Sequence, residues 1–267
     1  HLDYYSGLDE IRTTFINFIN KVPFYGLVII CLDDENLQGM IPEVKKRLMT
    51  YGLTSQADFM ATDIEHKGDR TSFLVVFRGE KLGRLSIRMP GRHNVLNALA
   101  AVAVAMELDM PFSAIAEGFQ DFGGVGRRFQ IKGEAQDIMI VDDYGHHPRE
   151  VEATIKAVRE GWPGRRLVMM LQPPRYTRTR DLFEDFSQVL AECDVLILTE
   201  IYAAGEEVIA GADGRALCAA IRARGKVSPI FIEDVENLGT DLTSILQDDD
   251  LVLTMGAGSI GRIASQL

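Results

Sequence analysis

The sequence predicts an α/β protein built from two domains. In the second half of the 267-residue chain, short apolar runs alternate with segments of helical spacing. This βαβα order is typical of a Rossmann-like, mainly parallel sheet with helices on both faces. In the first half, three short strand-like runs follow one another across turn sequences, which predicts a small antiparallel sheet. The length agrees with about two domains.

The first half opens with apolar side chains at helical spacing, followed by the β-branched run FYGLVIICL. The turn sequences KGDR and RGEK separate the strands of the antiparallel sheet, and Pro90-Gly91 follows the last of them. An Ala-rich segment that is apolar on nearly all sides then indicates a buried helix. The expected elements are helix 8–20, strand 24–32, helix 35–50, strands 58–65, 71–78 and 82–88, helix 94–108, and a helix from Pro111 to about Gly123.

The second half has a cleaner alternation. Strands are expected at 137–142, 166–171, 194–199, 228–232 and 250–254, with helices at 148–160, 178–192, 213–224 and 234–246 between them. In parallel sheets of this kind, ligands bind beyond the carboxyl ends of the strands, so the loops after 142 and 171 are the first candidates for a site. The glycine-rich segment 123–128 is the expected boundary between a domain of residues 1–127 and one of residues 128–267.

Composition excludes several classes of partner. With 28 basic and 39 acidic residues the net charge is −11, so the chain lacks the positive field that attracts nucleic acids and anionic membranes. The sequence has no run of 18 apolar residues, the length that a membrane-spanning helix needs. The three cysteines are far apart, without metal-ligand spacing, and are expected to be buried thiols in a reducing cytoplasm. Because the chain starts with His1 and not Met, we expect it to be part of a longer protein.

The strand at 137–142 is followed by the polar sequence D-D-Y-G-H-H-P, from Asp142 to Pro148. Asp143 is placed to hold a ribose hydroxyl, and His146 and His147 to meet a phosphate or to act as acid or base. The alternative is a capped helix N-terminus with solvated histidines. We favour a site, because the cluster falls where an α/β sheet binds its ligands.

The strand at 166–171 is followed by Q-P-P-R-Y-T-R-T-R. Between residues 162 and 180 there are five arginines and no acidic residue, in a protein of net charge −11. Guanidinium groups such as those of Arg175 and Arg178, at the start of a helix, suit a phosphate or a carboxylate. A solvated run of charge is the alternative, but the contrast with the acidic remainder of the chain favours an anion site.

Three further motifs have strong structural alternatives. Asn94 and Asn97 share one face of a helix start, where amides can read a base edge, although their spacing alone favours simple capping. The glycine-rich segment before Arg127 and Arg128 indicates either a hinge that delivers these arginines to a site or a bare linker. His1, with Asp3, is a candidate metal ligand or only a chain terminus.

The sequence G-A-G-S-I-G, residues 256–261, matches the dinucleotide pattern weakly. Since only six residues follow it, the βαβ unit and its acidic partner are missing, and a tight strand-to-helix turn is the better interpretation. An NAD-linked oxidoreductase therefore has little support. A G-x-x-x-x-G-K-[ST] phosphate loop does not occur in the sequence.

Taken together, these segments resemble the Mur ligases. The motifs P-G-R-H-N-V-L-N-A-L-A-A, G-V-G-R-R-F-Q, V-D-D-Y-G-H-H-P, Q-P-x-R-Y-T-R-T and G-A-G-S-I-G occur in the family's order, and the opening HLDYY is similar to a family segment ending in the same residues. The resemblance covers essentially the whole chain. It implies the latter part of the central ATP-binding domain, with its phosphate loop upstream, followed by the C-terminal amino-acid-binding domain.

The resemblance also implies roles for individual residues. It assigns Asn97, with Asn94 beside it, to the adenine, Arg128 to the nucleotide phosphates and Asp143 to the ribose. His1 is similar to a histidine that helps to hold Mg²⁺. By the same resemblance, the reacting centre is lined by Tyr144, His146, Arg175 and Arg178.

The implied reaction joins L-alanine to the carboxylate of UDP-N-acetylmuramate in peptidoglycan synthesis, with ATP and Mg²⁺ as cofactors and an acyl phosphate as intermediate. We expect this chain alone to be inactive. Where the family usually has Q-P-H-R, this sequence has Pro174, which makes the preference for L-alanine less secure. The alternative function is a non-catalytic module that binds nucleotides or anions.

Overall fold

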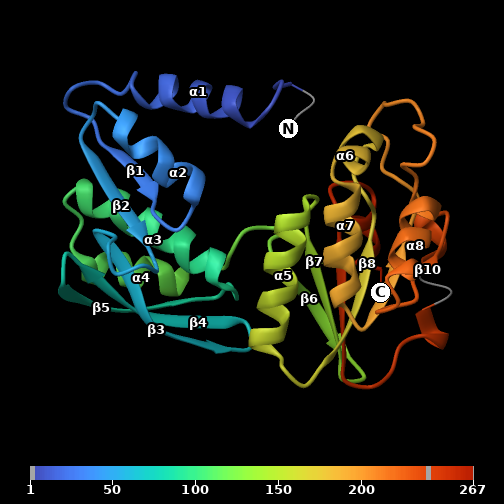
Figure 1. Ribbon diagram of the computed structural model, residues 1–267. Coiled ribbons are helices and arrows are strands. Elements are labelled where there is room, and N and C mark those ends of the chain that lie inside the picture. The colour runs from blue at the N-terminus through green and yellow to red at the C-terminus, as the bar shows by residue number, and fades with distance from the viewer. Residues whose placement is uncertain (1–3, 239–241, 267) are drawn as a thin grey trace. The chain divides into compact units, whose positions relative to one another are not determined.

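The computed structural model describes residues 4–238 and 242–266. The chain divides between Gly123 and Gly124 into two compact units, unit 1 before this point and unit 2 after it. The boundary of the family's domains after residue 127 stays a prediction. Figure 1 shows that each unit is a sheet covered by helices, and the predicted α/β class is confirmed.

Unit 1 is built on one mixed sheet with the strand order β1-β2-β3-β4-β5. Its strands are β1 (Val28–Cys31), β2 (Leu48–Gly52), β3 (Phe59–Lys67), β4 (Arg70–Phe77) and β5 (Glu80–Ile87), and its helices are α1 (Leu8–Ile19), α2 (Glu35–Met40), the 3-10 turn η1 (Ile41–Glu43), α3 (Arg92–Glu107) and α4 (Phe112–Asp121). The predicted antiparallel strands are β3 to β5. They continue a sheet that β1 and β2 begin in parallel, so the antiparallel part is not a separate sheet.

The helix predicted over 35–50 is wrong in its second half. α2 ends at Met40, and β2 pairs in parallel with β1 through Val28 opposite Leu48. Pro42 lacks the N–H group that a continuing helix needs. The Leu-Met-Thr-Tyr run that follows is stabilised more by pairing with the buried strand β1 than it would be as a helix. Tertiary contacts therefore outweigh the local helical spacing.

Unit 2 contains a six-stranded sheet in the order β10-β9-β8-β11-β7-β6. The strands are β6 (Gln130–Ala135), β7 (Ile138–Asp143), β8 (Arg166–Leu171), β9 (Val195–Leu198), β10 (Ile230–Phe231) and β11 (Asp250–Met255), and the helices and turns are α5 (Pro148–Gly161), α6 (Tyr176–Asp181), α7 (Phe183–Val189), η2 (Leu190–Glu192), α8 (Gly214–Ala223), η3 (Val235–Asn237), η4 (Leu242–Ser244) and α10 (Ile260–Ile263). All pairs except β6–β7 are parallel, so the mainly parallel sheet is confirmed.

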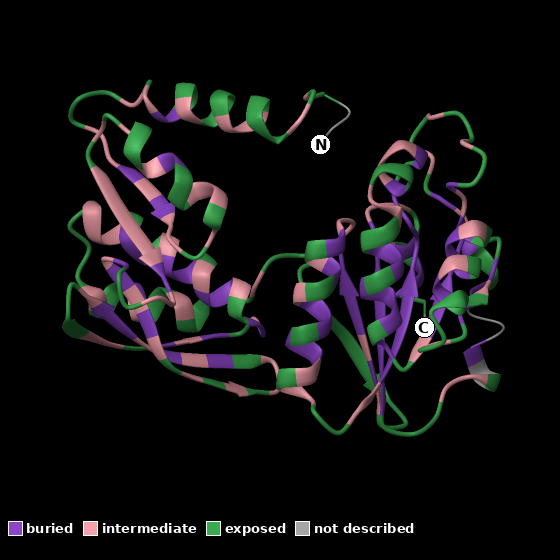
Figure 2. Ribbon diagram, in the orientation of Figure 1, coloured by how far each residue is buried: buried purple, intermediate pink, exposed green. Residues whose placement is uncertain are grey.

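The antiparallel strand β6 was not anticipated from the sequence. Only one of its six side chains is even partly buried, so it lacks the apolar run that marks the inner strands. Figure 2 shows β6 exposed beside the buried strands of the same sheet. Because β6 runs opposite to β7, with Gln130 opposite Asp142, it begins at the edge where β7 ends. The residues just before β6 therefore lie at the carboxyl edge of the sheet.

Two predicted helices of unit 2 have different forms in the structure. The helix expected over 178–192 starts earlier and bends at Leu182, which separates α6 from α7. The bend lets Leu182 and Phe183 both pack against the same core, whereas a straight helix would direct successive side chains about 100° apart. Over 234–246, the described residues form the 3-10 turns η3 and η4, and Asp234 favours a turn because its side chain accepts the N–H of Glu236.

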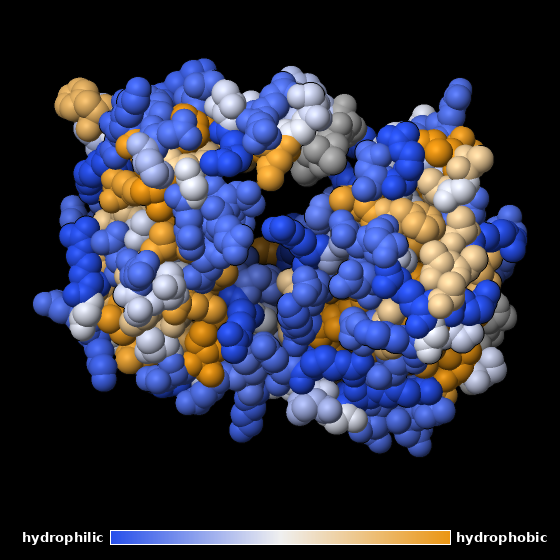
Figure 3. Space-filling view, viewed as in Figure 1, coloured by the Kyte–Doolittle hydropathy of each residue, from blue (hydrophilic) through white to orange (hydrophobic). Residues whose placement is uncertain are grey.

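The inner strands of unit 2 are buried on both faces. Along β8, Leu167 and Met169 belong to the core on one face, while Val168 and Met170 belong to the core on the other. Unit 1 has its own core between the sheet and α3 and α4. The visible surface is largely hydrophilic, with separate apolar patches (Figure 3). Among the described residues, no helix is long and apolar enough to cross a membrane.

The prediction of buried cysteines is confirmed for Cys193 and Cys218, while Cys31 is half-buried. Burial raises the pKa of Cys193 to about 12 and that of Cys218 to about 11. Both thiols therefore stay protonated at neutral pH and are poor nucleophiles.

Replacing Phe73 by Ala tests the core of unit 1. Phe73 is fully buried in β4, so Phe73→Ala is expected to lower the free energy of unfolding by about 3–5 kcal/mol. Phe24 in the same unit is 92% exposed, and Phe24→Ala is the matched control, with a change of about 0.5 kcal/mol or less. Urea denaturation followed by circular dichroism measures both, and equal effects would contradict the assigned core.

Candidate active site

Three loops meet at the carboxyl edge of the sheet in unit 2. β11 lies between β8 and β7, and Met255 at its end is opposite both Leu171 and Asp143. The ends of the three strands are therefore level. Backbone hydrogen bonds continue past them: Gln172 donates to the carbonyl of Met255 at 3.0 Å, and Gly256 donates to that of Asp143 at 3.2 Å. The loops after residues 142 and 171, which the sequence indicated as candidates, thus form one surface together with the glycine-rich loop that follows β11.

The glycine loop after β11 is filled by the protein's own side chains. Gln172 accepts the N–H of Ile260 at 3.1 Å, and its amide donates to the hydroxyl of Ser259 at 3.3 Å. A Cβ atom on Gly258 would lie 2.3 Å from the Gln172 side chain. Gly256 has φ of +143°, and a Cβ atom there would lie 2.7 Å from the backbone carbonyl oxygen of Gln172. These glycines allow Gln172 to approach, so the segment is the tight strand-to-helix turn and not a dinucleotide loop.

Asp143 is predicted to hold a ribose, and its carboxylate accepts hydrogen bonds from two backbone segments in this structure. One oxygen accepts the N–H of Phe129 at 2.8 Å and the other accepts that of Gly145 at 2.7 Å. The side chain is only 5% exposed. Burial raises the pKa of Asp143, although both N–H groups act in the opposite direction. A ribose contact would have to share oxygens that are already used.

The two histidines have different surroundings. His147 is the N-cap of α5, where its Nδ1 accepts the N–H of Arg149 at 3.3 Å. In His146, Nδ1 lies 3.1 Å from the carbonyl oxygen of Tyr144, an arrangement that assigns the proton to Nδ1 and leaves Nε2 as the basic nitrogen of the neutral ring. The histidines are therefore not equivalent: His147 supports the helix and His146 has a nitrogen suited to accept a proton.

Glu150 organises this loop, and we did not anticipate it from the sequence. Its carboxylate accepts the N–H groups of His146 and His147 at 2.9 and 3.2 Å, and lies 3.5 Å from Arg128. Burial alone would raise the pKa of Glu150, but these partners outweigh it and the net pKa is lowered. The signal was present in the sequence, because a glutamate three residues after an N-cap is typical of a capping box.

Arg127 and Arg128 lie at the carboxyl edge because β6 starts there. The side chain of Arg128 is 48% exposed and lies 3.5 Å from the carboxylate of Glu150. Arg127 is bound more closely: its Nε donates to Asp142 at 2.9 Å, and its guanidinium lies 5.0 Å from the centre of the Tyr144 ring. Neither residue is on a bare linker.

The two arginines of the expected reacting centre follow β8, Arg175 in the loop and Arg178 on α6. Arg175 is exposed and lies 3.9 Å from Glu206, in the loop after β9. Glu206 accepts both the N–H and the hydroxyl of Thr177, at 3.0 and 2.7 Å, and so holds the start of α6. Arg178 on α6 is half-buried and close enough to His147 to lower the pKa of that histidine. No sequence pattern indicated the role of Glu206, because its partners are 29 positions away.

Asn94 and Asn97 belong to unit 1. The helix starts at Arg92, two residues earlier than predicted, so Asn94 is inside the helix and does not cap it. Its amide donates to the carbonyl of Pro90 at 2.7 Å, and its side-chain oxygen accepts the Asn97 amide at 3.3 Å. Asn94 is buried while Asn97 is exposed, so Asn94 orients the amide that faces solvent.

The candidate metal ligand His1 lies outside the described residues. In the part of the chain that the structure describes, no group of three or more His, Cys, Asp or Glu residues could hold a metal ion.

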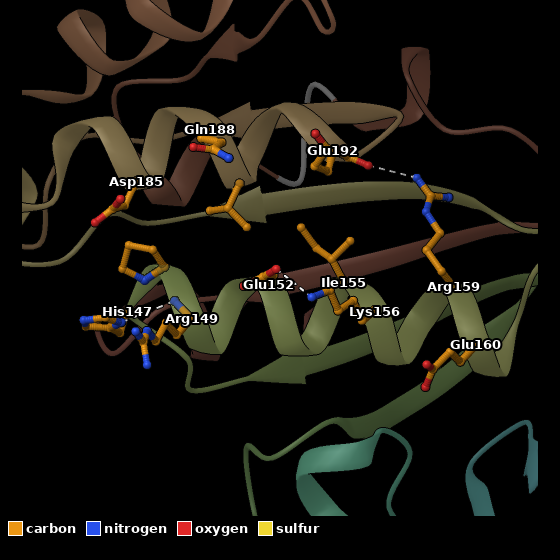
Figure 4. Close-up of a pocket in the computed structure, with 12 residues that line it drawn as sticks. His147, Arg149, Glu152, Ile155, Lys156, Arg159, Glu160, Asp185, Gln188 and Glu192 are labelled. Carbon is orange, nitrogen blue, oxygen red and sulfur yellow. Dashed lines mark hydrogen bonds and ion pairs between the residues drawn. The ribbon is translucent and has the colours of Figure 1, made fainter. Parts of the chain in front are cut away.

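A groove of about 660 Å³ runs along α5 and α7, with His147 at one end (Figure 4). Charged side chains of the groove are paired: Glu152 accepts from Lys156 at 2.6 Å, and Arg159 forms an ion pair with Asp194 at 2.8 Å. The groove follows helix faces and not the strand ends, so we do not assign the chemistry to it.

Comparison with known proteins gives consistent matches. The family described as Mur ligase middle domain matches residues 1–105, and the family described as Mur ligase, glutamate ligase domain, matches residues 127–258. The chain is 55% identical over its whole length to UDP-N-acetylmuramate–L-alanine ligase of Geotalea daltonii, and 54% identical over 97% of its length to that of Geobacter sulfurreducens. It spans 58% and 56% of these relatives' lengths.

Solved structures share the fold. The UDP-N-acetylmuramate–alanine ligase of Thermotoga maritima matches with a TM-score of 0.78 at 24% identity, over 100% of this chain and 55% of that one. The folylpolyglutamate synthase of Mycobacterium tuberculosis matches with a TM-score of 0.75 at 16% identity, over 100% of this chain and 60% of that one.

Replacing Asp143 by Asn tests its part in fixing the loop. The amide keeps one acceptor oxygen but turns an NH₂ group toward the second backbone N–H. We expect Asp143→Asn to lower the free energy of unfolding by about 1–3 kcal/mol, the cost of an unpaired buried group. Asp248→Asn, at an exposed position, is the control. Urea denaturation measures both, and an unchanged stability of Asp143→Asn would show that these hydrogen bonds contribute little.

Acidification is expected to weaken the N-cap of α5. Burial lowers the pKa of His147; the charge of Glu150 opposes this, and Arg178 and Arg149 add to it. Because the pKa is lower in the folded than in the unfolded state, this contribution to stability is full above about pH 6.5 and is lost as the pH falls through the folded pKa. His147→Asn keeps a good N-cap without titrating, so its free energy of unfolding should fall less between pH 7 and pH 5. Denaturation curves at both pH values measure this, and parallel losses would refute it.

Proposed function

This chain belongs to the Mur ligase family, and we propose that it forms part of an ATP-dependent ligase that joins L-alanine to the carboxylate of UDP-N-acetylmuramate in peptidoglycan synthesis. The proposal rests on relatives of that name, which are 54–55% identical to the chain. Since the chain spans less than two thirds of their length, the activity is proposed for the complete gene product. We further propose that residues 1–127 are the latter part of its central ATP-binding domain and that residues 128–267 are its C-terminal domain. We propose the cytoplasm as the location of the protein.

One observation carries the chemical part of the proposal. In a chain of net charge −11, three arginines lie at the carboxyl side of one sheet: Arg128 and Arg175 in loops and Arg178 on α6. Guanidinium groups bind phosphate and carboxylate groups through paired hydrogen bonds. The substrates of such a ligase carry phosphate and carboxylate groups, which are the anions that this edge suits.

ATP supplies, when bound, the phosphoryl group that activates the substrate carboxylate. Arg175 and Arg178 would stabilise the negative charge that develops on the reacting groups. His146 would take a proton from the incoming amine through Nε2, and Tyr144 would line the same centre. The loops would hold amine and activated carboxylate in attack geometry.

The nucleotide residues are proposed separately for each unit. In unit 1, Asn97 would contact the adenine, since its amide is exposed and oriented by Asn94. In unit 2, Arg128 would contact phosphates and Asp143 the ribose, although the oxygens of Asp143 already accept two N–H groups. The described residues do not supply a set of Mg²⁺ ligands, so we derive no step through the metal, and His1 remains the one ligand proposed from this chain.

The test uses the complete gene product. We expect ADP release that requires both UDP-N-acetylmuramate and L-alanine, and a kcat/KM lowered about 100-fold by Arg178→Ala, because removal of one charge-stabilising donor typically has this effect. Arg180→Ala is the matched control on the same helix, since Arg180 is exposed and pairs with its neighbour Asp181. Measurement of ADP at varied concentrations of each substrate gives the constants.

Absence of substrate-dependent ADP release would overturn the proposal. Tight binding of ATP without turnover would favour the alternative, a non-catalytic nucleotide-binding module. Replacement of L-alanine by glycine and L-serine in the same assay determines whether Pro174, which stands where the family usually has histidine, has relaxed the choice of amino acid.

A further inference from the structure

We propose that Arg127 is a positioning residue, which holds the Tyr144–His147 loop against the glycine loop after β11 and thereby places Tyr144 and His146 for the reaction. The inference rests on the proposed function. Arg127 is not expected to touch the reacting atoms, and the sequence indicated only that a glycine-rich hinge could bring it to a site.

The guanidinium of Arg127 contacts two segments at once, the end of β7 with the loop after it and the glycine loop after β11. Its Nε donates to Asp142 at 2.9 Å, one of its terminal nitrogens donates to the carbonyl of Gly256 at 2.6 Å, and its plane lies 5.0 Å from the ring centre of Tyr144. Its backbone carbonyl accepts the N–H of Tyr144 at 2.6 Å. Arg127 therefore fixes both the backbone and the ring at the start of the loop.

The carboxylate of Asp142, which accepts the hydrogen bond of Arg127, is itself held in place. Asp142 is fully buried, and its other oxygen accepts the hydroxyl of Thr254 on β11 at 3.0 Å. A buried carboxylate needs a charged partner with good geometry, and the forked guanidinium supplies one that Lys cannot copy. The buried carboxylate of Asp142 thus fixes the position of the Arg127 guanidinium. The guanidinium in turn fixes the position of the Tyr144 ring beside it.

Gly261 leaves the room that Arg127 occupies. A Cβ atom on Gly261 would lie 2.4 Å from the guanidinium, far closer than any real contact. Gly261 lies in α10, where an alanine backbone fits as well as glycine. Gly261→Ala therefore displaces Arg127 without removing it, which provides a second and independent variant.

A matched control exists at the opposite edge of the same sheet. Arg166 binds Asp250 with two hydrogen bonds of 2.8 and 2.7 Å and also donates to the carbonyl of Ile245 at 2.9 Å. Asp250 is as buried as Asp142. The two arginines thus make similar contacts with a buried aspartate and a backbone carbonyl, but Arg166 lies at the start of β8 and β11, away from the loops of the site.

The experiment compares Arg127→Lys, Gly261→Ala and Arg166→Lys in the complete gene product, with rates expressed per folded molecule from a thermal melt. We expect the first two to lower kcat about 10- to 100-fold, the usual effect of a misplaced catalytic group, with the KM for ATP changed less than threefold. Arg166→Lys should lower the melting temperature and leave kcat unchanged. If Arg127→Lys does not fold, Gly261→Ala decides alone.

Two results would overturn the inference. One is a kcat of Arg127→Lys and Gly261→Ala equal to that of Arg166→Lys, which would make Arg127 a stability residue only. The other is a lowered kcat of Arg127→Lys together with wild-type kcat values for Tyr144→Phe and His146→Ala. Arg127 would then act through neither Tyr144 nor His146. Failure of the wild-type protein to release ADP would instead refute the proposed function, so the two failures are distinguishable.

Discussion

The candidate site depends on the placement of β11 between β7 and β8. Met255 pairs with Asp143 on one side and with Leu171 on the other, so a single register brings three loops to one level. A slip by one residue would exchange the two faces of a strand whose side chains are all buried. The packing of the core therefore determines the register, and the register determines which polar groups meet at the edge.

The arginines at this edge fall into two groups according to how closely they are paired. Arg127 has a fully buried carboxylate at 2.9 Å, which is part of the framework. Arg128 and Arg175 face partly exposed carboxylates at 3.5 and 3.9 Å, distances at which a pair contributes little to stability. Cationic groups can thus stand at one edge of an acidic protein, because neighbouring carboxylates offset part of their charge.

The sequence predicted the strands of unit 2 well because buried parallel strands are continuous apolar runs. The same pattern shows where these strands end, and the loops after residues 142 and 171 stay the predicted site loops. The sequence failed to predict β6, whose side chains are mostly exposed, and residues 48–50, which pair with β1 and do not continue a helix. The roles of Gln172, Glu206 and Arg127 also escaped prediction, because each depends on contacts with residues that only the fold brings near.

The central position of β11 has a consequence for how unit 2 folds. The hydroxyl of Thr254 lies near the carbonyl of Val141 on β7, 113 positions earlier in the chain. Until β11 has been synthesised, β7 and β8 each have an unpaired apolar edge, and such edges invite association with other chains. Pairings between distant segments also form slowly. During synthesis, the half-made sheet is therefore the stage at which this unit is most exposed to aggregation and in greatest need of chaperones.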